Sequence, residues 1–415
     1  MTPQAALDAA LDASLPDPGG ARIGAAVSGG GDSMAMLALL ADWAARHSAV
    51  LNVASIDHGL RPEAAGELAA VADFAGDLGL SHETLDWTGW DGRGNLQAAA
   101  REGRYGLLTS WARAQGISHV CLGHTRDDQA ETVLMRLARG SGVDGLAAMS
   151  PARHAAGLTW LRPLLEVSRA DLRQELERRG LDWAEDPSND DTRYDRVRAR
   201  RLLAEMTPLG LSADGLAETA LRMRAARRVL AEAAAHATER IAEVEAGDIV
   251  LEREEFFALP DETRWRLFAG ALCQVAGTAY RPRFDALRRT LTTLADGGRA
   301  TLHGCLCQAD ARRVRIGREP AAVAGHVPAP GLWDGRWRIT CPKNMGLTAA
   351  ALGEAGLAER PGWRDSGLKR TTLLASPALW DSSRLHAALL IDDVPECHAE
   401  PVWGKTDFTA FLLSD

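Results

Sequence analysis

The feature that most constrains the fold is a regular alternation of strand-like and helix-like segments over the first 205 residues. Short apolar runs cover residues 22–27, 51–56, 83–87 and 119–122, and helically spaced segments follow them at 34–45, 63–78, 96–115 and 127–137. Strands separated by helices of this length form βαβ units and a parallel sheet. Right-handed crossovers bring the carboxyl ends of such strands to one edge, where ligands bind. We therefore expect an α/β domain with its site at that edge.

Beyond residue 205 the pattern changes twice. Residues 209–294 are dominated by Ala, Leu, Arg and Glu with few turn-forming residues, which is typical of helices. After Gly297 and Gly298, short apolar runs separated by Gly and Pro indicate strands. We therefore expect an α/β domain over residues 1–205, a helical domain over 206–298 and a small C-terminal domain with β-strands over 299–415.

Composition excludes several classes of protein. The 415 residues are 46% apolar and 25% charged with a net charge of −9, which is the balance of a soluble globular protein and not of a non-specific nucleic-acid coat. No apolar run approaches the roughly 20 residues that span a bilayer, and the N-terminus lacks the basic start of a secretory signal. The six cysteines are scattered without a Cys-x-x-Cys pair, which argues against disulfides, zinc or an iron–sulfur cluster. We expect a cytoplasmic protein with no membrane partner.

A glycine-rich hexad lies where the first strand ends and a helix begins. It consists of Ser28-Gly29-Gly30-Gly31-Asp32-Ser33. Glycines let backbone amides approach an anion, the helix N-terminus adds partial positive charge, and the serines add hydroxyl donors. A carboxylate beside phosphates is favourable when Mg²⁺ bridges them, so we assign Asp32 as a metal ligand. The Gly-Lys-Ser/Thr ending of a Walker loop is missing, and the alternative for the hexad is an ordinary strand-to-helix turn.

The hexad resembles the PP-loop of the ATP pyrophosphatase superfamily, and further motifs follow it in order. They are Asp57-His58-Gly59-Leu60-Arg61, Asn95-Leu96-Gln97-Ala98-Ala99-Ala100-Arg101 with Arg104-Tyr105, Gly123-His124-Thr125-Arg126-Asp127-Asp128-Gln129-Ala130-Glu131-Thr132, Arg162-Pro163-Leu164-Leu165, and Asp186-Pro187-Ser188-Asn189-Asp190 with Tyr194 and Arg200. This ordered set, over roughly residues 20–203, resembles the tRNA(Ile)-lysidine synthetases.

The resemblance implies a PP-loop fold and a two-step reaction. ATP, held with Mg²⁺ by the hexad together with Asp57 and His58, would adenylate the C2 oxygen of the wobble cytidine in the minor isoleucine tRNA with a CAU anticodon. Free lysine would then displace AMP and form lysidine, which changes codon reading from AUG to AUA.

Acidic residues cluster at the start of the helix after the fourth strand. Asp127, Asp128 and Glu131 are three or four residues apart, which places them on one helical face. A clustered pair can bind a lysine ammonium or Mg²⁺, or receive the proton that leaves the amine; the alternative is that they cap the helix. We expect Asp127, Asp128 and Glu131 to bind lysine. We expect the catalytic residues to be Asp32, His124, Asp128 and Glu131, and a purely structural His124 is the alternative.

Arginines supply the candidate RNA contacts. Guanidinium groups bind phosphates bidentately, and concentrated positive charge in an acidic chain suits RNA steering. We expect tRNA contacts from six of them, the alternative being a solvated face: Arg101, Arg104, Arg193, Arg196, Arg198 and Arg200. Weaker signals in the helical domain are Arg222, Arg224, Arg227, Arg228, Arg281, Arg283, Arg288 and Arg289.

Two other functions stay open on the sequence. Another PP-loop enzyme, such as a tRNA thiolase, would share the N-terminal domain, but thiolases of that kind use paired cysteines or an iron–sulfur cluster. A catalytically inert nucleotide-binding or tRNA-binding protein is disfavoured by the intact hexad and the acidic residues. We expect the C-terminal half, about residues 209–415, to grip the tRNA body, and the sequence leaves the oligomeric state open, a homodimer included.

Overall fold

The computed structural model describes residues 1–59, 64–90, 96–185, 193, 195–278 and 280–414. They divide into two compact units, Met1–Arg227 and Arg228–Ser414, and the boundary falls inside one long helix, α9 (Ala213–Ile241). Parts of the sequence motifs lie outside the described residues, namely Leu60, Arg61, Asn95, residues 186–190 and Tyr194. No helix in the described part of the chain combines the length and the apolar character needed to cross a membrane.

The first unit is built on a sheet in which six described strands run in the order β3-β2-β1-β4-β6-β5. The strands are β1 (Arg22–Ala26), β2 (Val50–Asp57), β3 (Ser81–Asp86), β4 (His119–Leu122), β5 (Ala152–Ala155) and β6 (Leu158–Leu161). Neighbours are parallel except β5 with β6, so the expected parallel α/β sheet is confirmed. The antiparallel edge was not expected from the sequence. It is a hairpin whose two turn residues, Ala156 and Gly157, both have positive φ.

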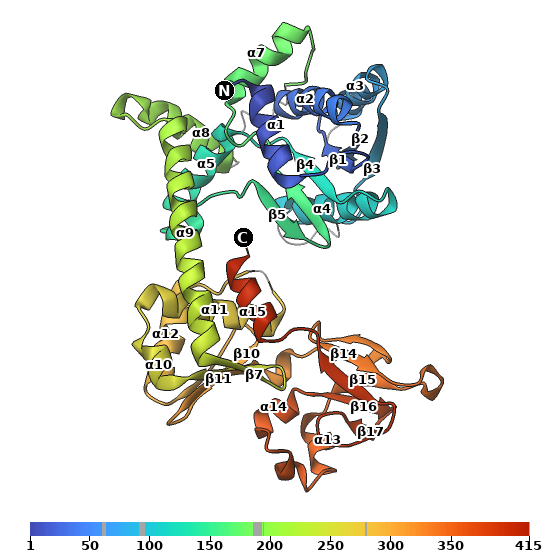
Figure 1. Ribbon diagram of the computed structural model, residues 1–415, viewed down its shortest axis with the longest axis vertical. Coiled ribbons are helices and arrows are strands. Elements are labelled where there is room, and N and C mark those ends of the chain that lie inside the picture. Colours follow the sequence, from blue (N-terminus) through green and yellow to red (C-terminus); the bar gives the residue numbers. More distant parts are fainter. Residues whose placement is uncertain (60–63, 91–95, 186–192, 194, 279, 415) are drawn as a thin grey trace. The chain divides into compact units, whose positions relative to one another are not determined.

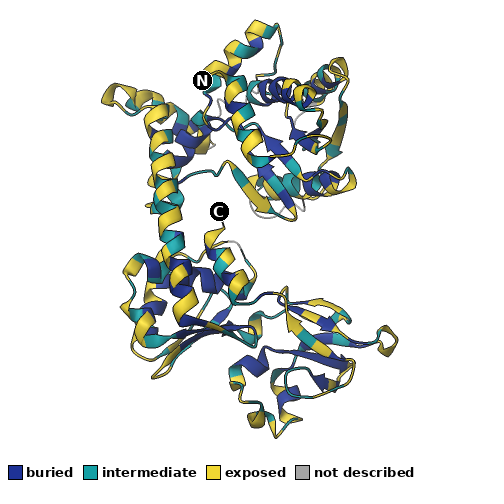
Figure 2. Ribbon diagram, viewed as in Figure 1, coloured by how far each residue is buried: buried dark blue, intermediate teal, exposed yellow. Residues whose placement is uncertain are grey.

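Helices cover both faces of this sheet (Figure 1). The helices of this unit are α1 (Pro3–Ser14), α2 (Gly31–His47), α3 (Ala64–Asp77), α4 (Leu96–Ala114), α5 (Arg126–Leu137), α6 (Val143–Leu146), α7 (Arg169–Arg179) and α8 (Asp195–Met206). Of these, α5, α6 and α8 pack with the start of α9 in a separate cluster. On one face α1, α2 and α7 pack with Ile23 and Val53, and on the other Trp111 of α4 packs with Ala54 and Val120. Val53 and Ala54 enter different cores because successive strand residues point to opposite faces, and the central strands β1, β2 and β4 are accordingly buried from both sides (Figure 2).

The second unit combines a helical core with three sheets in the described residues. Its helices are α10 (Arg253–Ala258), α11 (Asp261–Ala276), α12 (Phe284–Ala295), α13 (Gly353–Ala358), α14 (Arg370–Leu374) and α15 (Lys405–Leu413). The sheet β7-β8-β11-β10-β9 shares a core with α10, α11, α12 and α15; its strands are β7 (Ala242–Glu245), β8 (Asp248–Glu252), β9 (Arg299–Leu302), β10 (Cys305–Ala309) and β11 (Arg313–Arg318).

Two smaller sheets, β12-β15-β16-β17 and β13-β14-β18, follow in the chain. Their strands are β12 (Val327–Pro328), β13 (Gly331–Trp333), β14 (Trp337–Thr340), β15 (Thr348–Ala351), β16 (Pro377–Asp381), β17 (Arg384–Ala388) and β18 (His398–Pro401). The expected helical region followed by strand-rich structure is thereby confirmed.

Strands β7 and β8 lie within the segment that the sequence pattern assigned to helices. Ala246 and Gly247, both at positive φ, join them in a two-residue turn. Runs of four or five residues fit either a helical or a strand period. Pairing of β8 with β11, which is distant in sequence, decides the outcome.

Candidate active site

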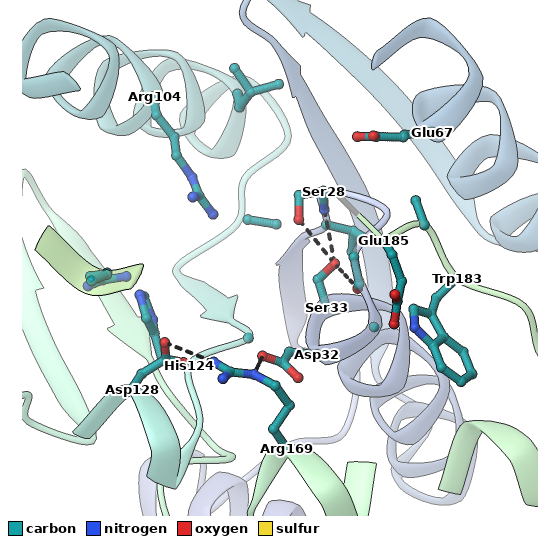
Figure 3. A pocket seen from close by; sticks show the side chains of 18 of the residues that line it. Ser28, Asp32, Ser33, Glu67, Arg104, His124, Asp128, Arg169, Trp183 and Glu185 are labelled. Atoms are coloured by element: carbon teal, nitrogen blue, oxygen red, sulfur yellow. Dashed lines mark hydrogen bonds and ion pairs between the residues drawn. The ribbon is translucent and has the colours of Figure 1, made fainter. Parts of the chain in front are cut away.

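A cleft of about 1420 Å³ opens beyond the carboxyl ends of β1, β2 and β4. Its walls include residues that directly follow these strands: Ser28 after β1, His58 after β2, and Gly123 and His124 after β4. Figure 3 shows the labelled side chains around this cleft. The cleft lies at the sheet edge where the strand–helix alternation predicts a ligand site.

The glycine loop, residues 28–33, forms the turn from β1 into α2. Gly30 is the N-cap of α2 and provides no side-chain cap for the first amides of the helix. The Ser33 hydroxyl donates to the Gly30 carbonyl at 2.9 Å and accepts from the backbone N–H of Ser28 at 3.1 Å, so it braces the turn. Gly29 has φ +85°, and a Cβ there would lie 3.2 Å from Glu67, so conformation and space both require glycine. The loop thus places uncapped helix amides at the cleft, which is a favourable anion site.

Three carboxylates converge on the guanidinium of Arg169, and Figure 3 shows two of them, Asp32 and Asp128, beside it. We call Asp32, Asp128 and Glu131 the carboxylate cluster. Arg169 Nε donates to Asp32 Oδ2 at 3.0 Å, Nη2 lies 3.4 Å from Asp128 Oδ1, and Nη1 lies 3.5 Å from Glu131 Oε1. A second arginine, Arg200, donates from Nε to Glu131 Oε1 at 2.9 Å. The structure thus brings together three of the expected site residues around a cation that sequence reasoning missed.

The two neighbouring aspartates of α5 have different environments. Asp127 Oδ2 accepts the backbone N–H of Arg169 at 2.7 Å, and this residue is absent from the described lining of the cleft. Asp128 Oδ2 accepts from the backbone and hydroxyl of Thr125 at 2.8 and 3.0 Å in a capping box, while Oδ1 faces Arg169. Asp127 therefore caps the start of α7, and one oxygen of Asp128 caps the start of α5.

Burial and neighbouring charges shift the pKa values in the cluster. Desolvation raises the pKa of Asp32 and of Glu131 against the opposing arginines. Burial also disfavours ionisation of Asp128, but the charge of Arg169 and the hydrogen bond from the Thr125 backbone help to lower its pKa below the usual value. Desolvation lowers the pKa of His124 to about 3, so its imidazole is neutral at pH 7. The cluster therefore contains carboxylates of unequal proton affinity beside a neutral imidazole, an arrangement suited to proton transfer.

Two residues at the end of β2 were expected to bind ATP, and only one of them lines the cleft. His58 lines the cleft, and desolvation lowers its pKa. Its ring meets Trp87 edge-on with centroids 5.6 Å apart. Asp57 Oδ1 instead accepts the backbone N–H of Gly59 at 2.7 Å and so holds the turn.

The six arginines expected to contact tRNA separate into two groups. The cleft-lining group is Arg104, Arg196 and Arg200, and the outer group is Arg101, Arg193 and Arg198. Arg196 and Arg200 share the cleft face of α8 because residues four apart lie on one side of a helix. Arg198 pairs with Asp195 on the exposed side, and Arg101 lies over the ring of Tyr105 at 5.2 Å.

Sequence reasoning missed several other cleft-lining side chains: Glu67, Arg173, Trp183 and Glu185. Trp183 reaches the cleft because the segment after α7 pairs with the glycine loop. The backbone N–H of Ala184 donates to the Gly29 carbonyl at 3.0 Å, and a Cβ at Gly31 would lie 3.2 Å from the Trp183 ring. The sequence did contain a signal for Arg169, which is the first residue of α7. The helix dipole is positive at that end, so a cation there is unfavourable unless an acidic partner stabilises it.

Asp32 fits a magnesium site that is shared with phosphates. Among the residues that the structure describes, no three His, Cys, Asp or Glu side chains are arranged to hold a metal ion. Mg²⁺, however, is commonly bound by one or two carboxylates with phosphate oxygens and water. Asp32 stands in the first turn of α2 beside the anion site, and Arg169 engages its Oδ2, so Oδ1 remains for such an ion.

The parallel sheet, the glycine loop and the cleft define a PP-loop nucleotide-binding domain, and a family model described as a PP-loop domain matches residues 3–207. A tRNA(Ile)-lysidine synthase of Ruegeria pomeroyi is 47% identical over 394 residues, which cover 95% of this chain and 94% of the relative. Proteins of the same name from Methylobacterium nodulans and Wolbachia pipientis are 42% and 33% identical, covering 72% and 79% of this chain and 91% and 78% of their own. The chain belongs to the tRNA(Ile)-lysidine synthase family, a family of ATP-using enzymes, as the sequence motifs indicated.

Proposed function

We propose that this enzyme uses ATP to join free lysine to C2 of the wobble cytidine in the isoleucine tRNA with a CAU anticodon. The C2 oxygen attacks the α-phosphate and pyrophosphate leaves. The lysine amine then forms a C2–N bond while the C2–O bond to AMP breaks. One observation carries this proposal: a single cleft contains an anion-binding loop, Asp32 and Asp128 of the carboxylate cluster, and basic side chains, two of which, Arg169 and Arg200, pair with the buried Glu131. The names of the relatives support the same substrate.

The glycine loop would hold the ATP phosphates. The uncapped amides of α2 point their partial positive charge toward the cleft. Asp32 would share a magnesium ion with these phosphates, and that ion would neutralise their charge when bound. His58 lines the same cleft and would contact the nucleotide.

The lysine amine would bind at Asp128 and Glu131. Its free pKa is about 10.4, so a base must take a proton before the nitrogen can attack. Glu131 is suited to this because burial raises its pKa. His124, which is neutral at pH 7 and lines the cleft, would help to position ATP.

Basic side chains of both units would bind the tRNA. Arg104, Arg196 and Arg200 surround the chemistry. In the second unit, Tyr280 is 83% exposed and Phe284 49% exposed, with exposed arginines beside them in the chain, Arg283 and Arg288. Aromatic rings stack on bases and guanidiniums bind phosphates, so this surface supports the tRNA-binding role assigned to residues 206–298.

The decisive assay incubates the protein with ATP, Mg²⁺, labelled lysine and tRNA. We expect label in the isoleucine tRNA with a CAU anticodon and none in methionine tRNA with the same anticodon. Sulfur transfer in place of lysine incorporation would contradict the proposal and favour a thiolase. The described cysteines make that alternative less favourable, since all six are buried and unpaired.

A further inference from the structure

Arg169 pairs with the same carboxylates that would bind lysine and magnesium in the proposed function. Its Nε, Nη2 and Nη1 face Asp32, Asp128 and Glu131 at 3.0, 3.4 and 3.5 Å. The side chain is 20% exposed and lines the cleft. A substrate ammonium therefore meets carboxylates that already have a cationic partner.

The carboxylate oxygens of the cluster are not all engaged, which leaves room for a further cation. Three carboxylates of the cluster face two guanidiniums, those of Arg169 and Arg200. Glu131 is 1% exposed, and its Oε2 has no hydrogen-bond partner among the described atoms. The site attracts an ammonium electrostatically, while Arg169 competes for the same oxygens.

Arg169 can exchange partners without moving its helix. The backbone at the start of α7 is held by Asp127, which accepts the Arg169 N–H at 2.7 Å, and by Ser168, whose hydroxyl accepts the N–H of Asp171 at 3.0 Å. Only the guanidinium then has to swing. Its shortest carboxylate partner, Asp32, lies in the glycine loop, where the ATP phosphates would arrive. A guanidinium binds phosphate as a fork, so phosphates there offer it an alternative partner.

We propose that Arg169 is a positioning residue that enforces ordered binding, with ATP before lysine. Without ATP its guanidinium shields Asp128 and Glu131 from the lysine ammonium. ATP phosphates draw the guanidinium away and expose these carboxylates. This inference rests on the proposed function.

The test is lysine binding by calorimetry to the full-length protein, with and without a non-hydrolysable ATP analogue and Mg²⁺. We expect the wild type to bind lysine about 10-fold more tightly with the analogue, which is a common size for coupling between two sites. In Arg169→Gln the carboxylates are never shielded, so the analogue should change lysine affinity less than about 2-fold. Arg178→Gln is the matched control: Arg178 lies on the same helix and pairs with Glu175 outside the cleft lining. It should keep the wild-type coupling.

Coupling of wild-type size in Arg169→Gln, or none in the wild type, overturns the ordered-binding role. If Arg169→Gln does not fold, Arg169→Lys replaces it, because that variant keeps the charge and loses the fork that reaches three carboxylates. Undiminished coupling in Arg169→Lys also overturns the proposal. Failure of lysine to bind the wild type even with the analogue overturns the proposed lysine site itself. Lysine binding with unchanged coupling overturns only the role of Arg169.

Discussion

Each unit buries a cluster of carboxylates and arginines, and the two clusters differ in charge balance. In the first unit, the three carboxylates of the carboxylate cluster face two guanidiniums. In the second unit, three carboxylates face three guanidiniums; these residues are Glu245, Asp248, Asp334, Arg315, Arg318 and Arg336. We call the second set the balanced cluster.

The balanced cluster joins elements of the second unit to one another. Asp248 of β8 is 3% exposed and accepts from Thr372 of α14 at 2.5 Å and from Arg315 Nη1 at 3.1 Å. Arg336 donates to Asp334 at 2.7 Å and to the Ala375 carbonyl at 3.4 Å. A buried set with equal charges and paired oxygens is a structural brace. The carboxylate cluster of the first unit instead borders a cleft through Asp32 and Asp128, which suits the cation-binding role proposed for it.

The largest expected effect is on stability in the balanced cluster. In Asp248→Ala the buried Arg315 loses one of its carboxylate partners. Removing one partner of a buried ion pair lowers the free energy of unfolding by about 3–5 kcal/mol. Urea unfolding should show this destabilisation, while ATP turnover of the folded variant stays at the wild-type rate. A decrease in the free energy of unfolding of less than about 1 kcal/mol is typical of an exposed ion pair, and it would contradict the stabilising role of the balanced cluster.

In the cleft we expect the opposite result, a loss of activity with little change in stability. Asp32→Ala should lower AMP and pyrophosphate production about 10²–10³-fold, the usual cost of removing one electrostatic interaction with reacting charge. Its urea midpoint should stay near wild type because burial raises the pKa of Asp32, so the ionised carboxylate is not a net source of stability. Asp42→Ala, on the same helix and paired with Arg179, is the control and should keep its activity. Near-full turnover in Asp32→Ala would refute the phosphate-side role of that residue.

A smaller effect separates the lysine side of the cleft from the phosphate side. Glu131→Gln removes one charged hydrogen-bond partner and should raise the KM for lysine about tenfold, with less change in the KM for ATP. Adenylated tRNA should still form and is measured by labelled AMP on tRNA. Loss of adenylation with an unchanged KM for lysine would assign Glu131 to the metal instead.

The cleft should also make stability depend on pH. The folded pKa of His124 is about 3 against about 6.5 when unfolded, so between these values the unfolded state binds more protons. The free energy of unfolding then falls as pH decreases from about 6.5, by at most about 1.4 kcal/mol per pH unit, and it has no such slope above 6.5. Asp128, with its lowered pKa, acts in the same direction at lower pH. His124→Gln should flatten the slope between pH 6.5 and 5 in urea titrations, and an unchanged slope would contradict this origin.

The smallest effect concerns exposed arginines outside both clusters. Replacing Arg283 and Arg288 by Gln should make the salt dependence of tRNA affinity shallower, by about 0.7–0.9 in log–log slope for each phosphate that the variant no longer binds. Stability should change by less than about 0.5 kcal/mol, as is usual for exposed substitutions. Filter binding at several salt concentrations measures the slope, and an unchanged slope would show that this surface does not bind tRNA phosphates.

Local sequence carried much of the information about the cleft. The alternation of apolar runs and helices predicted the parallel sheet because each period is a property of a short segment. The glycine loop was recognisable in the sequence because two neighbouring positions call for glycine. Gly29 has positive φ, and Gly30 begins α2 without a side-chain cap. Helical spacing predicted that Asp128 and Glu131 lie together. It also placed Asp127 with them, whereas the structure turns Asp127 to the start of α7.

The sequence by itself determined the alternation of strands and helices as far as α5, the glycine loop, the acidic side of α5 and membership of the family. Only the tertiary structure decided which cation meets those acids. Arg169 is 137 residues from Asp32 along the chain, and the packing of α7 on α2 brings them within 3.0 Å. Pairing between distant strands likewise decided that β7 and β8 are strands and that β5 is antiparallel. The physical reason is the same in each case: spacing along a chain specifies a face of one element, whereas the partner of that face depends on contacts between elements far apart in sequence.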